Sequence, residues 1–310
     1  MTRRRAILAA AAFGLCLLVP AVVHQDYQLN VLFRVFLFAA LGLAWNLVGG
    51  YAGQLSLGHA AYFGIGAYGL ALFHDKLGAP LPVALVLGVL AAVAAAFVIG
   101  RVTFRMRGPY FALATIAFAE LLRLSAKNFH SVTGGDVGAQ IPPLFGDDRS
   151  RWFYWAAVVL TALAFTITAL IARSRFGYQL QAVREDEDTA RACGIDPART
   201  KLLALLVSAA LTAAGGALSA SLFFYIVPDQ VLGIDVSNKI AIVAMLGGAG
   251  TLTGPIVGAV LLETSAEVFK NVFHDAHRLI YGGLIVLIVL FLPEGIVGAV
   301  AGWWRRRRAP

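Results

Sequence analysis

The chain has 310 residues, of which 59% are hydrophobic and only 14% are charged, with a mean hydropathy of +0.78 and a formal net charge of +8. Soluble domains carry about 25% charged and about 45–50% apolar residues, so a water-soluble fold of this composition would expose a large apolar surface and aggregate. The composition excludes a cytosolic enzyme, a disordered chain and a secreted disulfide scaffold. It predicts an integral membrane protein, in which loop topology rather than nucleic-acid binding explains the basic residues.

Long apolar runs follow one another along the chain. A helix needs about 20 apolar residues to cross a bilayer, where lipid offers the backbone no hydrogen-bond partner. Two runs are weaker candidates: Pro109–Leu124, which contains Glu120 and Arg123, and Ile240–Phe273, which glycines interrupt. The clear candidates for membrane-spanning helices are Ala6–Val23, Leu29–Val48, Leu55–Phe73, Leu81–Gly100, Trp152–Ala172, Leu202–Val227 and Leu279–Val300.

Clusters of arginine and lysine predict the orientation of these helices. The positive-inside rule places all four clusters in the cytoplasm, with both termini, so an even number of helices separates consecutive clusters. Pro109–Leu124 must then cross. If Ile240–Phe273 is a hairpin broken at Gly247–Gly250, about ten helices result, and if it dips without crossing, eight result; we expect about ten. The clusters are Arg3–Arg5; Arg101, Arg105 and Arg107; Arg173, Arg175, Arg184, Arg191, Arg199 and Lys201; and Arg305–Arg308.

Motifs of enzyme chemistry are missing from the sequence. There is no G-x-x-x-x-G-K-[ST] loop for ATP phosphates, and no H-E-x-x-H, C-x-x-C or G-x-S-x-G. A G-x-G-x-x-G string at Gly64, Gly66 and Gly69 lies inside an apolar run with no preceding strand, which favours helix packing over dinucleotide binding. We therefore expect no enzymatic activity, no metal site and no cofactor bound by this chain.

One polar stretch, residues 173–201, contains six of the clustered basic residues and five acidic ones. Phe176–Cys193 is predicted to form one helix that Gly194 ends, and Asp196-Pro197 starts a new turn or helix. Two short helices with small residues at the cytoplasmic face would fit a groove on a soluble partner. The alternative interpretation is a solvated loop that only enforces topology.

Two interruptions of the apolar runs share the pattern A-G-x-L-[ST], at Ala52–Ser56 and Ala249–Thr253. Free backbone groups at broken helices can line a polar path, and polar side chains in a membrane must face protein or water. The shared pattern is either a relic of internal duplication or a coincidence, and His59 alternatively bonds a neighbouring carbonyl. The candidate path residues are Asn46, Gly53, Gln54, Ser56, His59, Gly250, Thr251 and Thr253.

Several further motifs, in order along the chain, resemble those of LivM-like permeases of branched-chain amino-acid ABC importers. Each motif is weak alone, but the ordered set is specific and covers roughly Leu29 to Val297. The matching segments are Gly49–Tyr68, Arg107–Thr115, Thr133–Gly135, Arg175–Gly177, Ala182–Glu187, Gly194–Asp196, Leu246–Pro255 and Phe291–Gly295.

The resemblance implies an all-α polytopic membrane protein with the type II (vitamin B12 permease-like) importer fold in a bacterial inner membrane. A single permease domain would span residues 1–310, with a cytoplasmic coupling segment at 173–201 and a basic cytoplasmic tail at 303–310. That family's coupling segment follows the sixth helix, and the charge clusters independently place six crossings before Arg173. The resemblance implies ATPase coupling through Arg184, Glu185, Asp186, Glu187, Ala190, Gly194, Ile195 and Asp196.

The same resemblance implies partners: two ATP-binding cassette subunits that hold ATP and magnesium, a second homologous permease, and a periplasmic or extracellular substrate-binding protein. The expected function is import of branched-chain or related amino acids. One alternative is import of urea or short amides by the same architecture. Another is a stand-alone ion-coupled transporter with Glu120, Glu263 or Glu267 as proton or sodium sites, although Glu120 and Arg123, three residues apart, are expected to pair with each other.

Overall fold

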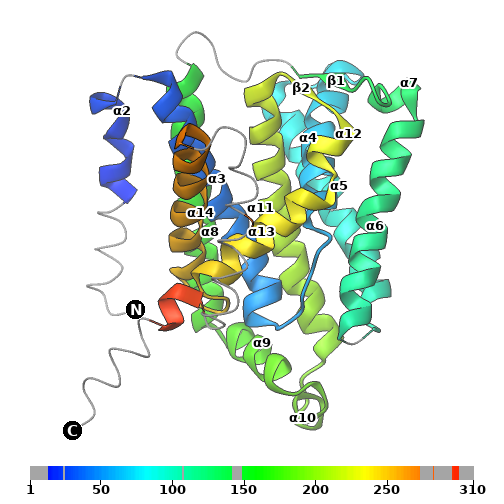
Figure 1. Cartoon of the computed structure of the whole chain (residues 1–310). Coiled ribbons are helices and arrows are strands. Elements are labelled where there is room, and N and C mark those ends of the chain that lie inside the picture. Colours follow the sequence, from blue (N-terminus) through cyan, green and yellow to red (C-terminus); the bar gives the residue numbers. More distant parts are fainter. Residues whose placement is uncertain are drawn as a thin grey trace, which may run out of the picture.

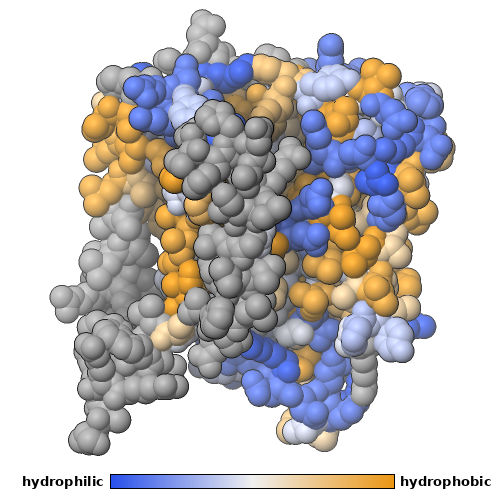
Figure 2. Space-filling model, in the orientation of Figure 1, coloured by the Kyte–Doolittle hydropathy of each residue, from blue (hydrophilic) through white to orange (hydrophobic). Residues whose placement is uncertain are grey.

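The computed structural model describes residues 13–23, 25–106, 108–141, 149–272, 282 and 295–299. Within these ranges the chain forms a helical bundle, with two short helices at one end and a pair of very short strands at the other (Figure 1). Hydrophilic residues gather at both ends of the visible face, and hydrophobic residues predominate along its sides between them (Figure 2). This distribution is typical of a protein that spans a membrane.

The helices account for nearly all of the regular structure in the described residues. The strands pair antiparallel, with Ala139 opposite Ile226 and Gln140 opposite Tyr225. In chain order the elements are α2 (Val19–Val22), α3 (Asp26–Asn46), the π-helix η1 (Leu47–Tyr51), α4 (His59–Asp75), α5 (Leu81–Thr103), α6 (Pro109–Asn128), α7 (His130–Thr133), β1 (Ala139–Gln140), α8 (Arg149–Arg173), α9 (Arg175–Glu185), α10 (Glu187–Ala192), α11 (Pro197–Phe223), β2 (Tyr225–Ile226), α12 (Pro228–Val231), α13 (Ile234–Gly247) and α14 (Gly254–Val272).

Proline and capping residues set the starts of the long helices. Pro109 and Pro197 open α6 and α11, where proline's missing N–H costs no hydrogen bond. The Asp196 carboxylate caps α11 by accepting hydrogen bonds from the N–H groups of Ala198 and Arg199, at 3.0 and 3.2 Å. Asp196-Pro197 therefore begins a helix, as the sequence predicted.

Glycines bring α4 into close contact with two neighbouring helices. A Cβ added to Gly66 would lie 2.1 Å from the carbonyl oxygen of Ala213 in α11, and one added to Gly69 would lie 2.6 Å from the Cα atom of Gly88 in α5. Such approach between helices is possible only where no side chain intervenes. The interpretation of the G-x-G-x-x-G string as a helix-packing motif is confirmed.

Six helices in the described residues are long and apolar enough to cross a membrane, among them α6, which extends the weak candidate Pro109–Leu124. The predicted break in Ile240–Phe273 is confirmed, because α13 ends at Gly247 and α14 begins at Gly254. The predicted run Leu55–Phe73 is helical only from His59, since residues 53–58 are not helical. The run Leu279–Val300 and the tail at 303–310 lie largely or wholly outside the described residues, as do Arg3–Arg5.

The prediction of one helix over Phe176–Cys193 is wrong. Asp186 has an extended backbone, with φ −160° and ψ 119°, and it divides the segment into α9 and α10. The side chain of Asp186 accepts a hydrogen bond from the N–H of Thr189, which starts α10 as a separate helix. The helix that follows Asp196 is also not short: α11 has 27 residues. The two short helices of the segment are thus α9 and α10.

Candidate coupling site and substrate path

The end of α3 and η1 lie in contact with the second A-G-x-L-[ST] interruption, although about 200 residues separate them. The first interruption, Ala52–Ser56, directly follows η1, which continues α3 and ends at Tyr51. The second interruption joins α13 to α14. The buried side chain of Asn46, the last residue of α3, makes this contact, because its Nδ2 donates to the carbonyl oxygen of Thr251 at 2.8 Å and its Oδ1 accepts from the N–H of Gly250 at 2.7 Å. Three of the candidate path residues thus form one contact, which we call the inner junction.

Glycine is required at equivalent places in the two interruptions. Gly53 and Gly250, the second residue of each motif, have φ +68° and +81°, a region that favours glycine over residues with a Cβ. A Cβ on Gly50 would lie 2.3 Å from the nitrogen of Gly250 and 1.9 Å from Asn46 Oδ1. The two backbones of the inner junction therefore approach to a distance at which no larger residue fits.

Arg184 of α9 reaches into the inner junction. Its Nη1 donates to the carbonyl oxygen of Gly50 at 2.7 Å. A Cβ added to Gly250 would lie 2.5 Å from the same nitrogen, and one added to Gly53 would lie 2.8 Å from Arg184 Cγ. One side chain of the predicted coupling segment thus touches both interruptions, a contact that the sequence did not predict because the three segments are far apart along the chain.

Glu187 at the start of α10 faces the body of the protein. Its Oε1 accepts from Lys201 Nζ at 2.8 Å and from Gln54 Nε2 at 3.3 Å. The Lys201 side chain is fully buried, and its ammonium lies 5.4 Å from the centre of the Phe104 ring. This pair fastens α10 to the first turn of α11 and to the first interruption.

The other predicted coupling residues divide into an inner and an outer set. Ala190 is buried and Ile195 is half-buried. Gly194 has φ +84° and ends α10 as predicted, with the N–H of Ile195 donating to the carbonyl oxygen of Ala190 at 3.0 Å. The residues that are exposed and free to meet a partner are Glu185, Asp186, Gly194 and Asp196.

Asp186, the exposed residue that caps α10, is expected to make the stability of the protein depend on pH. The hydroxyl and N–H of Thr189 hold the pKa of the Asp186 carboxyl below its usual value. The stability from this cap is therefore present above the unfolded pKa of about 3.9 and is lost as the pH falls through the folded pKa. We expect Asp186→Ala to lower the thermal midpoint at about pH 7 but not near pH 2, measured in lipid nanodiscs. Asp186→Asn, which keeps the cap without titrating, is the control, and an equal effect of Asp186→Ala at both pH values would contradict the assignment.

Ser56 and His59 lie in a buried network of hydrogen bonds rather than beside a carbonyl. The two ring nitrogens of His59 lie 3.1 Å from Ser56 Oγ and 2.8 Å from Ser208 Oγ, and Ser237 Oγ accepts from the N–H of Ala60 at 2.8 Å. All four of these polar side chains are fully buried. Among the remaining path candidates, Gly53 and Thr253 are exposed and Gln54 is half-buried. The sequence did not single out Ser208, in an apolar run, or Ser237, in a short polar stretch, because a single serine carries no local signal of its distant partner.

The three glutamates considered as ion sites, Glu120, Glu263 and Glu267, are each paired with a cationic side chain. Arg123 binds Glu120, at 2.8 Å from Nε to Oε2, which confirms the predicted pair, and it also bonds Asp229. On α14, Glu263 lies 2.7 Å from Lys239 Nζ and Glu267 lies 2.5 Å from Arg34 Nη2. The partners Lys239 and Arg34 come from α13 and α3, so spacing along the chain could not indicate them.

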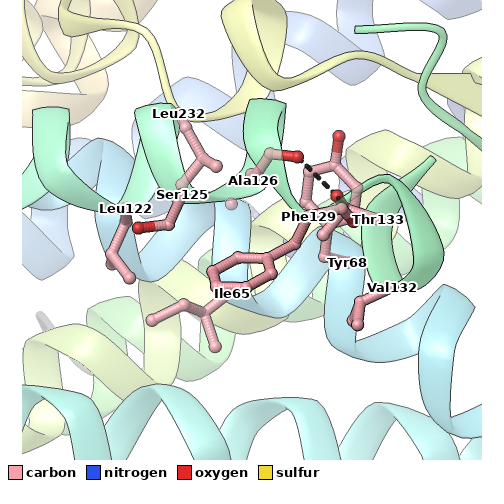
Figure 3. Close-up of a pocket in the computed structure, with 10 residues that line it drawn as sticks. Ile65, Tyr68, Leu122, Ser125, Ala126, Phe129, Val132, Thr133 and Leu232 are labelled. Atoms are coloured by element: carbon pink, nitrogen blue, oxygen red, sulfur yellow. Dashed lines mark hydrogen bonds between the residues drawn. The ribbon is translucent and has the colours of Figure 1, made fainter. Parts of the chain in front are cut away.

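Two cavities lie toward the end of the bundle at which β1 and β2 pair. One, of about 370 Å³, is lined mainly by apolar side chains, including Ile65 of α4, Leu122 of α6 and Phe129 directly after α6 (Figure 3). The other, of about 520 Å³, lies between α3, α11 and the α12–α13 segment. We call it the polar cavity, because Arg34 and Lys239 line it together with aromatic side chains.

Comparison with known proteins identifies the family. A family model described as "Branched-chain amino acid transport system / permease component" matches residues 27–289. The chain belongs to this family. The match includes the inner junction, the segment with Arg184 and Glu187, and the helices around the polar cavity, so all the geometry described above is part of the permease.

Individual relatives agree with this assignment. The permease is 32% identical to the high-affinity branched-chain amino acid transport system permease protein LivM of Salmonella typhimurium, over 90% of this chain and 71% of that protein. It is 30% identical to LivM of Escherichia coli, over 96% of this chain and 76% of that protein. The permease protein LivH of Escherichia coli is 25% identical, over 84% of this chain and 91% of its own length. No solved structure matches the chain.

Proposed function

We propose that this permease imports branched-chain or related amino acids as part of an ATP-binding cassette transporter, with α9 and α10 as the segment that couples it to separate ATPase subunits. The observation that carries the proposal is the hydrogen bond from Arg184 to the carbonyl oxygen of Gly50 at the inner junction. The segment of α9 and α10 has exposed acidic residues on one side and places Arg184 against both broken helices on the other. It can therefore transmit a movement from a partner to the path.

The coupling mechanism follows from these contacts. In this mechanism the ATPase subunits contact the exposed residues of the segment, which are Glu185, Asp186, Gly194 and Asp196. ATP binding draws the ATPase subunits together and thereby moves α9 and α10. Arg184 and Glu187 pass the displacement to the two interruptions, because they bind Gly50, Gln54 and Lys201 directly. Separation of Asn46 from Gly250 and Thr251 at the inner junction opens a path lined by free backbone groups.

The proposed assembly has about ten crossings in the type II (vitamin B12 permease-like) fold, with both termini in the cytoplasm of a bacterial cell. Among the described residues before the coupling segment, α3, α5, α6 and α8 are long and apolar enough to cross a membrane. The shorter helices Phe13–Val22 and α4 complete the six crossings that the proposal requires. The similarity to both LivM and LivH supports pairing of this permease with a homologous one. ATP and magnesium would bind the cassette subunits, and a substrate-binding protein would deliver the amino acid.

The alternatives receive less support from the geometry. Ion coupling through Glu120, Glu263 or Glu267 needs a carboxylate available to a proton or sodium ion, yet each of the three is paired with an arginine or lysine. Urea has no hydrocarbon portion to fill the aromatic part of the polar cavity, and neither urea nor a short amide carries charges to pair with Arg34 and Lys239. Import of an amino acid accounts for both the charged and the aromatic lining.

The test is Arg184→Gln in the assembled transporter, reconstituted in liposomes with its ATPase subunits and binding protein. We expect ATP-dependent leucine uptake to fall by about tenfold or more while ATP hydrolysis persists, since Arg184 lies between the motor and the junction. Arg191→Gln is the matched control, because Arg191 is exposed and pairs with Asp188 of the same helix. Uptake by the purified permease alone, driven by an ion gradient without ATP, would refute the proposal.

A further inference from the structure

The polar cavity has the size and composition of a small-molecule site. Its volume of about 520 Å³ lies within the range of roughly 300–1,000 Å³ that ligand pockets occupy, and such pockets combine apolar walls with a few polar groups. The side chains that matter for a ligand are Phe33, Arg34, Phe63, Ser219, Gln230 and Lys239.

The charged wall of the polar cavity is electrically balanced. Arg34 and Lys239 line the cavity, and they are held by Glu267 and Glu263 of α14 at 2.5 and 2.7 Å. The two cationic side chains remain 35% and 34% exposed, and each has more N–H donors than its glutamate uses. Because the four charges sum to zero, a ligand that is itself neutral overall can enter without leaving an uncompensated charge away from water.

The apolar wall meets the charged wall inside the same cavity. Phe33 of α3 and Phe63 of α4 are buried in the core and present aromatic surface to it. The ammonium of Lys239 lies 3.9 Å from the centre of the Phe38 ring, which also lines the cavity. The cavity of Figure 3, by contrast, has no charged residue in its lining and offers no ionic partner to a zwitterion.

We infer that the polar cavity binds the zwitterion of an apolar α-amino acid during transport. The carboxylate accepts hydrogen bonds from Arg34 and Lys239, the ammonium donates to the oxygens of Ser219 and Gln230, and the hydrocarbon side chain packs against Phe33 and Phe63. This inference rests on the proposed function and extends it, because it gives the permease a selectivity of its own for a ligand with both charges and an apolar side chain.

Direct binding to the assembled transporter, in nanodiscs and without the binding protein, tests the ligand class. Bound radiolabelled leucine is titrated with three unlabelled competitors. These are leucine itself, leucinol, which lacks the carboxylate, and 4-methylpentanoate, which lacks the ammonium. We expect leucine to bind and each analogue to compete about tenfold or more weakly, since each leaves one set of polar groups unpaired. Equal competition by either analogue would overturn the zwitterion assignment.

Two variants locate the site. Ser219→Phe fills the cavity and is expected to weaken leucine binding by about tenfold or more, and glycine binding by less, because only leucine needs the occupied volume. Ala94→Phe adds the same bulk at an exposed position of α5 and is the control. The charge swap Lys239→Glu with Glu263→Lys keeps an ion pair but moves the cation off the cavity wall, so leucine binding should also fall while the thermal midpoint stays near that of the unaltered protein.

The outcomes separate the inference from the proposed function. ATP-dependent uptake by the unaltered transporter without measurable leucine binding, or with unchanged binding in Ser219→Phe and the charge swap, would overturn the site and leave the proposed function standing. Absence of ATP-dependent leucine uptake in the unaltered transporter would overturn the proposed function itself. Leucine binding that only the cavity variants weaken supports the inference.

Discussion

Replacing Glu187 with alanine is expected to lower the free energy of unfolding by about 3–5 kcal/mol, the range measured when one member of a buried ion pair is removed. The Lys201 side chain is fully buried and the Glu187 side chain is only 18% exposed, so solvent cannot compensate the remaining ammonium. The same change removes the bond from Gln54 to α10. The measurement is thermal unfolding of the purified permease in lipid nanodiscs.

The double variant Glu187→Ala with Lys201→Met is the control for this prediction. Replacing both partners of a buried ion pair with apolar residues is often neutral or stabilising, so we expect the double variant to recover most of the stability lost by the single one. Coupled uptake should not recover in the double variant, because α10 is no longer fastened to Gln54. If Glu187→Ala alone retains full stability and loses only uptake, Glu187 acts on a partner subunit and not on Lys201.

Features with a local cause could be predicted from the sequence. Apolar runs of sufficient length became the long helices α5 and α8, and the glycine-rich stretch between Ile240 and Phe273 became the break before α14. The start of α10 also had a local signal that the prediction overlooked. Asp186 is followed by Glu187 and Asp188, and an aspartate before acidic residues is a common helix start.

Features with a long-range cause could not be predicted in this way. The ion pair between Lys239 and Glu263 and the bonds of Asn46 to the second interruption join residues that are distant in the chain, and no periodicity marks their partners. The polar residues around the first interruption could be listed as a group, but the sequence could not separate His59, enclosed in the core, from the exposed Gly53. That separation depends on how α4 packs against α11.

Replacing Asn46 with alanine is expected to loosen the inner junction and to lower stability by about 2–6 kcal/mol, taking about 1–3 kcal/mol for each buried group left unsatisfied. The two groups are the N–H of Gly250 and the carbonyl of Thr251, both bonded to a side chain that is fully buried. Hydrogen exchange detected by mass spectrometry on peptides covering residues 247–254 should show faster exchange of the Gly250 amide, because that amide loses its acceptor.

An aspartate at position 46 separates the two bonds. Asn46→Asp keeps an oxygen for the N–H of Gly250 but cannot donate to the carbonyl of Thr251 while ionised. Exchange of the Gly250 amide should therefore remain slow in Asn46→Asp, although the buried charge lowers overall stability. Rapid exchange at Gly250 in both variants would mean that packing of α13 against α14, rather than the Asn46 side chain, holds the second interruption in place. Slow exchange in both would show that the junction closes without Asn46, and the two interruptions would then be linked through Arg184 alone.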